Sequence, residues 1–132
     1  QRDAHHAAVR VLAQGMLDLH LLSGSLSEVI ETESYKKFFM HRTSHWLGKD
    51  VHDAGDYRQG EQWTPLQPGM ALTIEPGCYI RPAKDVPEAF WNIGVRIEDD
   101  AVVTSSGCEI ITGGVPKTIA DIEALMRDAP VG

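Results

Sequence analysis

Apolar residues recur at steps of three and four over the first part of the chain, which is the period of an amphipathic helix. Ala8, Leu12 and Leu19 follow this pattern, and it predicts a helix over about residues 3–21. Gly24, which follows shortly after the pattern stops, offers the left-handed conformation that commonly ends a helix.

A second, shorter helix is predicted directly afterwards. Ser25 and Glu28 have the spacing of a capping box, so the helix would begin after Ser25. The helical period fades from Phe38, and residues 41–55 hold three His and two Gly without clean alternation. We therefore expect a strand or an extended loop there, and polar segments of this kind tend to hold functional sites.

The middle of the chain has the alternation and the β-branched and aromatic residues that are typical of strands. The predicted strands are residues 70–80, 93–97, 101–104 and 108–112. Gly and Pro predict surface loops at residues 56–68 and 82–87.

Thr118 opens a predicted C-terminal helix. One face of this helix is apolar and would hold Ile119, Ile122, Leu125 and Met126. Helices first, strands in the middle and one closing helix favour an α+β fold, in which helices pack on an antiparallel sheet.

Composition narrows the class of protein. The chain has 132 residues and a net charge of −7, which argues against nucleic acid and anionic membranes as partners. No apolar stretch approaches the ~20 residues of a membrane helix. Cys78 and Cys108 form at most one bridge, so we expect reduced thiols and a cytoplasmic location.

The densest group of chemically active residues is a histidine cluster. His41, His45 and His52 lie within twelve residues, in a chain with six His. His41 and His45 have the spacing of a zinc protease helix, but Arg42 stands where that motif needs Glu. This excludes the zinc protease motif, and polar surface histidines around a structural loop remain an alternative.

Glu75 follows an apolar strand, where a carboxylate is costly unless it is paired or bound to metal. Strand alternation places Glu75, Gly77 and Tyr79 on one face and Cys78 on the other. The alternative is a glutamate at a strand end that points to water.

A second glutamate lies in the next predicted strand. Arg96 and Glu98 share one face with Gly94 and Asp100, whereas Val95 and Ile97 share the other, which we expect to face the core. On its own, this pattern also fits an exposed ion pair of little energetic weight.

Together, one imidazole and two glutamates from different segments form a mixed nitrogen and oxygen donor set. Such a set suits Mn, Co, Zn or Fe.

Three segments, residues 41–53, 73–79 and 95–99, resemble the C-terminal half of the Xaa-Pro aminopeptidase (aminopeptidase P) family, which belongs to the pita-bread metallopeptidases of family M24. The resemblance runs from about residue 36 to residue 129. The motifs occur in the order of the family, with 30 residues from His45 to Glu75 and 23 from Glu75 to Glu98.

The resemblance implies a fold and a set of ligands. The fold would be the C-terminal half of a pita-bread domain, with helices packed on a curved antiparallel sheet. His45 and Glu75 would ligate one metal of a dinuclear, typically manganese, centre, and Glu98 would bridge both metals.

Four further residues match positions around the substrate in this family. His41 and His52 would bind the scissile peptide and stabilise its tetrahedral intermediate. Tyr79 and Arg96 would line the substrate cleft or support the ligands.

The family has five protein ligands, and two of them are aspartates from the N-terminal half that have no counterpart in this sequence. We therefore expect residues 1–132 to be the C-terminal portion of one catalytic domain, with the N-terminal half absent. We expect at most one metal site and little or no activity from the chain alone. We expect the uncovered edge of the sheet to associate with a second copy of the chain or with the missing N-terminal half.

The activity implied for the parent enzyme is release of the N-terminal residue from peptides with proline in the second position. The alternatives are a prolidase that acts on Xaa-Pro dipeptides, a pita-bread enzyme with other chemistry, and a pita-bread module that binds peptide without catalysis.

Overall fold

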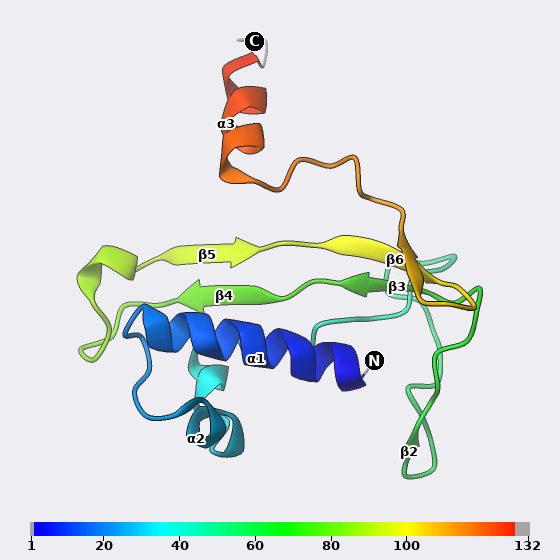
Figure 1. Ribbon diagram of the computed structural model, residues 1–132, viewed down its shortest axis with the longest axis horizontal. Helices are drawn as coiled ribbons and strands as arrows, with labels where there is room; N and C mark the ends of the chain where they lie inside the picture. The colour runs from blue at the N-terminus through cyan, green and yellow to red at the C-terminus, as the bar shows by residue number, and fades with distance from the viewer. Residues whose placement is uncertain (1, 129–132) are drawn as a thin grey trace.

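The computed structural model describes residues 2–128 and consists of long antiparallel strands, with the two N-terminal helices on one side and the C-terminal helix on the other (Figure 1). The α-helices are α1 (Arg2–Asp18), α2 (Leu26–Glu31) and α3 (Ile119–Asp128), and the short 3-10 helices are η1 (Ser34–Lys37) and η2 (Glu88–Phe90). The strands are β1 (Arg58–Gln59), β2 (Gln62–Trp63), β3 (Ala71–Ile74), β4 (Gly77–Ile80), β5 (Ile93–Arg96), β6 (Asp99–Val103) and β7 (Cys108–Ile110).

The strands form two main antiparallel groups that follow one another along the molecule. β3 pairs with β6, β6 pairs with β7, and β4 pairs with β5. Because β4 follows β3 and β5 precedes β6, the two groups make one long ribbon (Figure 1). The two groups meet at Glu75 and Pro76 on one side and at Ile97 and Glu98 on the other, where Ile97 N donates to Pro76 O at 3.3 Å.

The prediction of one strand over residues 70–80 is therefore wrong in detail. The strand is divided at Pro76, which has no amide hydrogen to donate to a ladder. The divided region carries Glu75, so the break lies at the chemically interesting position. The region predicted as a loop, residues 56–68, also contains the small β1–β2 hairpin.

Both predicted N-terminal helices are present, and their ends differ in one respect from the prediction. α1 ends at Asp18, earlier than predicted, and the left-handed residue that follows it is His20, with φ of 56°. Gly24 also has the predicted positive φ, of 101°, but it lies six residues beyond the end of the helix. The cap of α2 is confirmed, because Glu28 N donates to Ser25 Oγ at 3.2 Å.

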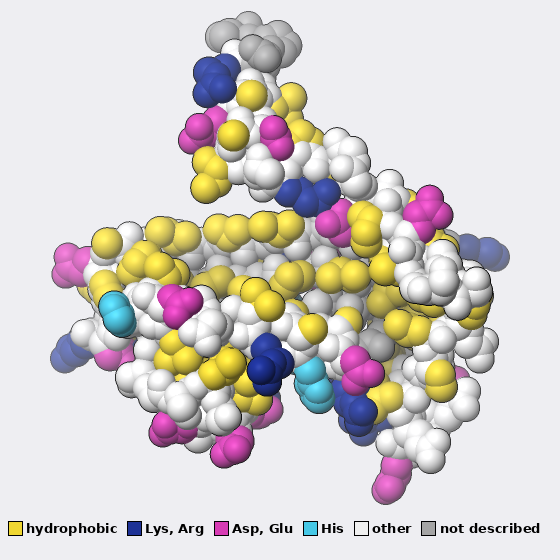
Figure 2. Space-filling view, in the orientation of Figure 1, with side chains coloured by type: hydrophobic (Ala, Val, Ile, Leu, Met, Phe, Trp, Pro, Cys, Tyr) yellow, Lys and Arg dark blue, Asp and Glu magenta, His cyan; other side chains and the backbone are white. Residues whose placement is uncertain are grey.

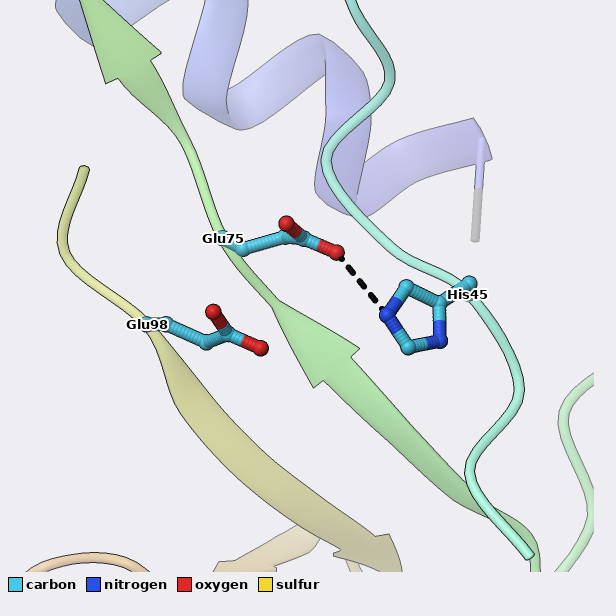
Figure 3. A group of neighbouring side chains, drawn as sticks. All are labelled: His45, Glu75 and Glu98. Carbon is cyan, nitrogen blue, oxygen red and sulfur yellow. Dashed lines mark ion pairs between the residues drawn. The ribbon is translucent and has the colours of Figure 1, made fainter. Parts of the chain in front are cut away.

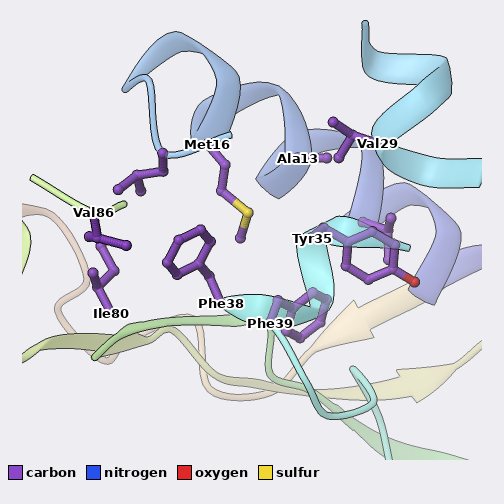
Figure 4. Packing of buried hydrophobic residues seen from close by; sticks show 10 residues of the cluster. Ala13, Met16, Val29, Tyr35, Phe38, Phe39, Ile80 and Val86 are labelled. Atoms are coloured by element: carbon purple, nitrogen blue, oxygen red, sulfur yellow. The ribbon is translucent and has the colours of Figure 1, made fainter. Parts of the chain in front are cut away.

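The core lies between α1, α2 and η1 on one side and β4 on the other. α1 contributes Ala13 and Met16, and the chain after η1 contributes Phe38 and Phe39, which are almost fully buried; β4 contributes Ile80 (Figure 4). Burial of one such large apolar side chain contributes about 1.5–3 kcal/mol. This packing fixes the helices against the strand that leads out of the site.

The expectation that Val95 and Ile97 face the core is wrong. Within the described residues no element covers this face of β5, and Ile93, Val95 and Ile97 are 45, 52 and 49% exposed. Figure 2 shows hydrophobic side chains in a row along β5. Val95 lies opposite Cys78 and shares its face of the pair, but only β4 contributes residues to the core, and β5 lies beyond the region that the helices cover.

The C-terminal helix is present as predicted and stands apart from the ribbon (Figure 1). Asp121 N donates to Thr118 Oγ1 at 3.2 Å, which caps the helix. Its predicted apolar face is exposed and consists of Ile119, Ile122, Leu125 and Met126. Over residues 2–128 no helix has the length and apolar character needed to span a membrane.

Candidate metal centre

The segment that carries His45 runs beside β3, on the edge opposite β6. Thr73 N donates to His45 O at 3.0 Å, and Glu75 N donates to Thr43 O at 2.7 Å. Trp46 forms a β-bridge with Leu72. These backbone hydrogen bonds fix the register between the two segments, so His45 and Glu75 meet at the point where β3 ends.

Three side chains converge there from three segments. His45, Glu75 and Glu98 each offer one donor atom, and these atoms lie within 4.8 Å of one another (Figure 3). His45 Nε2 is 3.1 Å from Glu75 Oε1. Glu75 is only 9% exposed, whereas Glu98 is exposed and lies between β5 and β6. The structure thus brings together the three residues that the sequence suggested as ligands.

His45 is oriented by its own backbone neighbour. Its Nδ1 lies 2.9 Å from the carbonyl oxygen of Trp46, and a carbonyl oxygen only accepts, so Nδ1 carries the hydrogen. This leaves Nε2 to face the carboxylate of Glu75, and its distance of 3.1 Å from Oε1 is that of two groups that share a proton or a cation. One imidazole nitrogen and two carboxylates form a mixed donor set that fits a divalent metal ion.

Thr73 is a residue of the site that the sequence analysis missed. Its side chain is buried, donates from Oγ1 to Glu75 Oε1 at 3.0 Å, and accepts from His45 N at 3.1 Å. The signal in the sequence was its position two residues before Glu75, on the same face of the strand.

Arg96 holds the other oxygen of Glu75. Its Nη1 donates to Glu75 Oε2 at 3.0 Å, and its Nε donates to the Tyr79 hydroxyl at 2.7 Å. The pKa of Arg96 is raised, chiefly by the hydrogen bond to Tyr79, with further contributions from the charges of Glu75 and Glu98. Arg96 is therefore paired within the site and is not an isolated surface charge.

The chain of hydrogen bonds continues to His41. The Nδ1 of His41 donates to the carbonyl oxygen of Arg42 at 2.6 Å, which leaves Nε2 to accept from the Tyr79 hydroxyl at 3.0 Å. Arg96, Tyr79 and His41 thus form one ordered sequence of donors and acceptors.

His52 lies on the other side of the group. Its ring centroid is 4.4 Å from that of His45, and the side chain is exposed. Within residues 2–128 its imidazole has no hydrogen-bond partner in the protein, so it is accessible to a ligand. All seven residues that the sequence indicated therefore gather around one place.

Comparisons with known proteins identify the family of the chain. The model of metallopeptidase family M24 matches residues 1–105, so the chain belongs to this family. The match also covers α1, which precedes the part where the sequence motifs lie. Family M24 is a metallopeptidase family, and this places a divalent metal among the expected components of the site.

The Xaa-Pro aminopeptidase of Haemophilus influenzae is 48% identical over 126 residues, which are 96% of this chain and 29% of that protein. The structure of Pseudomonas aeruginosa aminopeptidase PepP has a TM-score of 0.92 and 56% identity, and covers 96% of this chain and 29% of that one. Zinc-substituted Escherichia coli aminopeptidase P in complex with product has a TM-score of 0.85 and 47% identity, over 94% and 28% of the two chains.

These similarities confirm the predicted α+β architecture as part of the pita-bread fold of aminopeptidase P. The chain spans less than a third of the length of the curated relatives it matches.

Proposed function

We propose that this chain is part of a metal-dependent aminopeptidase that releases the N-terminal residue from peptides with proline in the second position. The observation that carries the proposal is the group of His45, Glu75 and Glu98, whose donor atoms lie within 4.8 Å of one another in a chain of family M24. The high identity to Xaa-Pro aminopeptidases supports the choice of substrate.

His45, Glu75 and Glu98 would hold the metal ion, which we propose to be manganese in a centre that is dinuclear in the whole enzyme. Bound there, a divalent ion supplies Lewis acidity, which lowers the pKa of a water and stabilises negative charge on a carbonyl oxygen. The protein's own contribution is to fix the donors. Thr73 and Arg96 each hold one oxygen of Glu75, and the Trp46 carbonyl sets the tautomer of His45.

The histidines on either side of the ligands would act on the peptide. His52 has an exposed imidazole and can donate a hydrogen bond where negative charge develops on the scissile carbonyl. Both nitrogens of His41 are engaged, so His41 would act by positioning the Tyr79 hydroxyl or by exchanging it for substrate. Arg96 would hold Tyr79 from the opposite side.

We also propose that residues 1–132 form the C-terminal portion of one catalytic domain. Three donors hold one ion at most, and a companion N-terminal half would supply the remaining ligands and cover β5. Until it is covered, the exposed row of Ile93, Val95 and Ile97 favours self-association. The free thiols of Cys78 and Cys108 support a cytoplasmic location.

Peptide length tests the proposed activity against that of a prolidase. The enzyme reconstituted with its N-terminal half, loaded with Mn²⁺, should hydrolyse Xaa-Pro-Yaa tripeptides faster than Xaa-Pro dipeptides. Glu98→Gln should abolish the activity, and Glu109→Gln, an exposed residue of β7, should leave it unchanged. Preference for dipeptides would favour a prolidase, and absence of both metal and hydrolysis would favour a peptide-binding module.

A further inference from the structure

A pocket lies beside the candidate metal centre, on the far side of His41. It has a volume of about 450 Å³ and is formed by the start of α1, by η1, by the chain that follows η1, and by β2. Its basic lining residues are Arg2, His5, His6, Lys36, His41 and Arg42. His41 belongs to both places, since it lines this pocket and contacts Tyr79 of the site.

The charge of this pocket is opposite to that of the chain. The protein has a net charge of −7, yet the one acidic residue that lines the pocket is Glu33, which is already paired with Lys36. The pKa of His5 is lowered, first by burial and then by the positive surroundings of Arg42, His6, Lys36 and His41. Several cationic or ionisable groups therefore act on the same small volume.

The side chain of Arg42 contacts an aromatic ring and makes no hydrogen bond to the residues that the structure describes. Its guanidinium carbon lies 5.0 Å from the centre of the Trp63 ring, and Arg58 lies 4.5 Å from the same ring. Among the residues that the structure describes, no carboxylate lies within 4.0 Å of Arg42. A cation–π contact restrains a guanidinium and leaves its N–H groups available for a bidentate acceptor.

We propose that this pocket, which lies beyond His41 from the candidate metal centre, binds a carboxylate of the peptide substrate, with Arg42 as the principal donor. This inference rests on the proposed function for the identity of the ligand. The carboxylate is either the C-terminus of a short peptide or an acidic side chain downstream of proline.

The pocket can be tested without metal and without hydrolysis, by ¹H–¹⁵N NMR titration of the chain. The probes are acetyl-Ala-Pro-Ala with a free C-terminus, its C-terminal amide, and acetyl-Ala-Pro-Glu amide. We expect either carboxylate to shift the indole N–H of Trp63 and to bind at least about tenfold more tightly than the neutral amide.

Two variants separate the pocket from a general charge effect. Arg42→Gln should abolish the difference between acid and amide, and Arg42→Lys should retain only part of it, because a lysine gives no bidentate contact. Lys37→Gln is the matched control, since Lys37 pairs with Asp85 away from this pocket. The Trp46 and Trp91 indole signals report whether each variant keeps its fold.

Equal affinity for acid and amide, an unchanged difference in Arg42→Gln, or equally tight binding of inorganic phosphate would overturn the inference. Because the titration needs neither metal nor turnover, such a result would leave the proposed aminopeptidase activity standing. Conversely, if the reconstituted enzyme showed no aminopeptidase activity but the titration gave the expected preference for carboxylates, the inference about the pocket would still hold.

Discussion

The hydroxyl of Thr73 donates a hydrogen bond to the carboxylate of Glu75 at 3.0 Å, within one strand end that is almost completely buried. The same hydroxyl oxygen accepts from the backbone amide of His45 at 3.1 Å. One small side chain therefore fixes two proposed ligands that lie on different segments. It also holds Glu75 Oε1 at its position 3.1 Å from His45 Nε2.

Thr73→Val keeps the shape of the residue and removes this hydroxyl. We expect the affinity for Mn²⁺ to fall about 10–100-fold, as is typical when a partner of a metal ligand is lost. Isothermal titration calorimetry on the chain measures this directly. Thr73→Ser retains the hydroxyl and should bind Mn²⁺ nearly as tightly as the parent, so equal affinity in the valine variant would contradict the role of Thr73.

Arg96 should matter through its geometry and not only through its charge. Arg96→Lys keeps a cation near Glu75 but cannot donate to both Glu75 and Tyr79 in one plane. We expect the affinity for Mn²⁺ to fall by about tenfold, and Arg58→Lys to have little effect. If Arg96→Lys bound Mn²⁺ as tightly as the parent, the paired hydrogen bonds of Arg96 to Glu75 and Tyr79 would have no part in holding Glu75.

The uncovered face of β5 should make the chain associate with itself. Val95 and Ile97 are about half exposed, and full burial of such residues contributes about 1.5–3 kcal/mol each. The double variant Val95→Thr, Ile97→Thr should therefore weaken association by at least about tenfold in sedimentation velocity. Val11→Thr, at an isolated exposed position on α1, is the control, and a monomeric parent at high concentration would contradict the prediction.

The lowered pKa of His5 predicts that the folded chain loses stability in mild acid. Burial and its cationic neighbours lower the pKa of His5 in the folded chain, so between that value and the ordinary 6.5 the unfolded chain binds the proton and the folded chain does not. The free energy of unfolding should therefore decrease as pH falls below about 6.5.

Urea unfolding at about pH 7.5 and about pH 5.5 measures this dependence. His5→Gln should reduce the difference between the two conditions, and His20→Asn, at an exposed position, should not. An unchanged difference in His5→Gln would exclude His5 as its source.

Local patterns allowed much of the fold to be predicted. The helix caps at Ser25 and Thr118 depend on a few neighbouring residues, and both are present. The exposure of Val95 was not predictable, because alternation identifies an apolar face but cannot say whether any element covers it. Pro76 could have indicated that the strand is divided, because proline has no amide hydrogen for a ladder. The regular alternation of residues on either side of Pro76 suggested one continuous strand.

The same distinction holds for the site. His45, Glu75 and Glu98 were indicated by residue type and by family motifs, because metal ligation requires particular side chains. Thr73 was missed because a threonine in a strand is ordinary, and its role depends on contacts with two segments. The basic pocket depends on α1 and β2 lying close to Arg42, which residue spacing cannot reveal.

The central claim is that His45, Glu75 and Glu98 bind a divalent metal ion. Titration of the metal-free chain with Mn²⁺, followed by calorimetry, tests it most directly in the parent and in His45→Ala, Glu75→Gln and Glu98→Gln. We predict binding of one ion in the parent, lost or severely weakened in each of the three variants and retained in Glu109→Gln. Equal Mn²⁺ binding by the parent and the three ligand variants would contradict the claim.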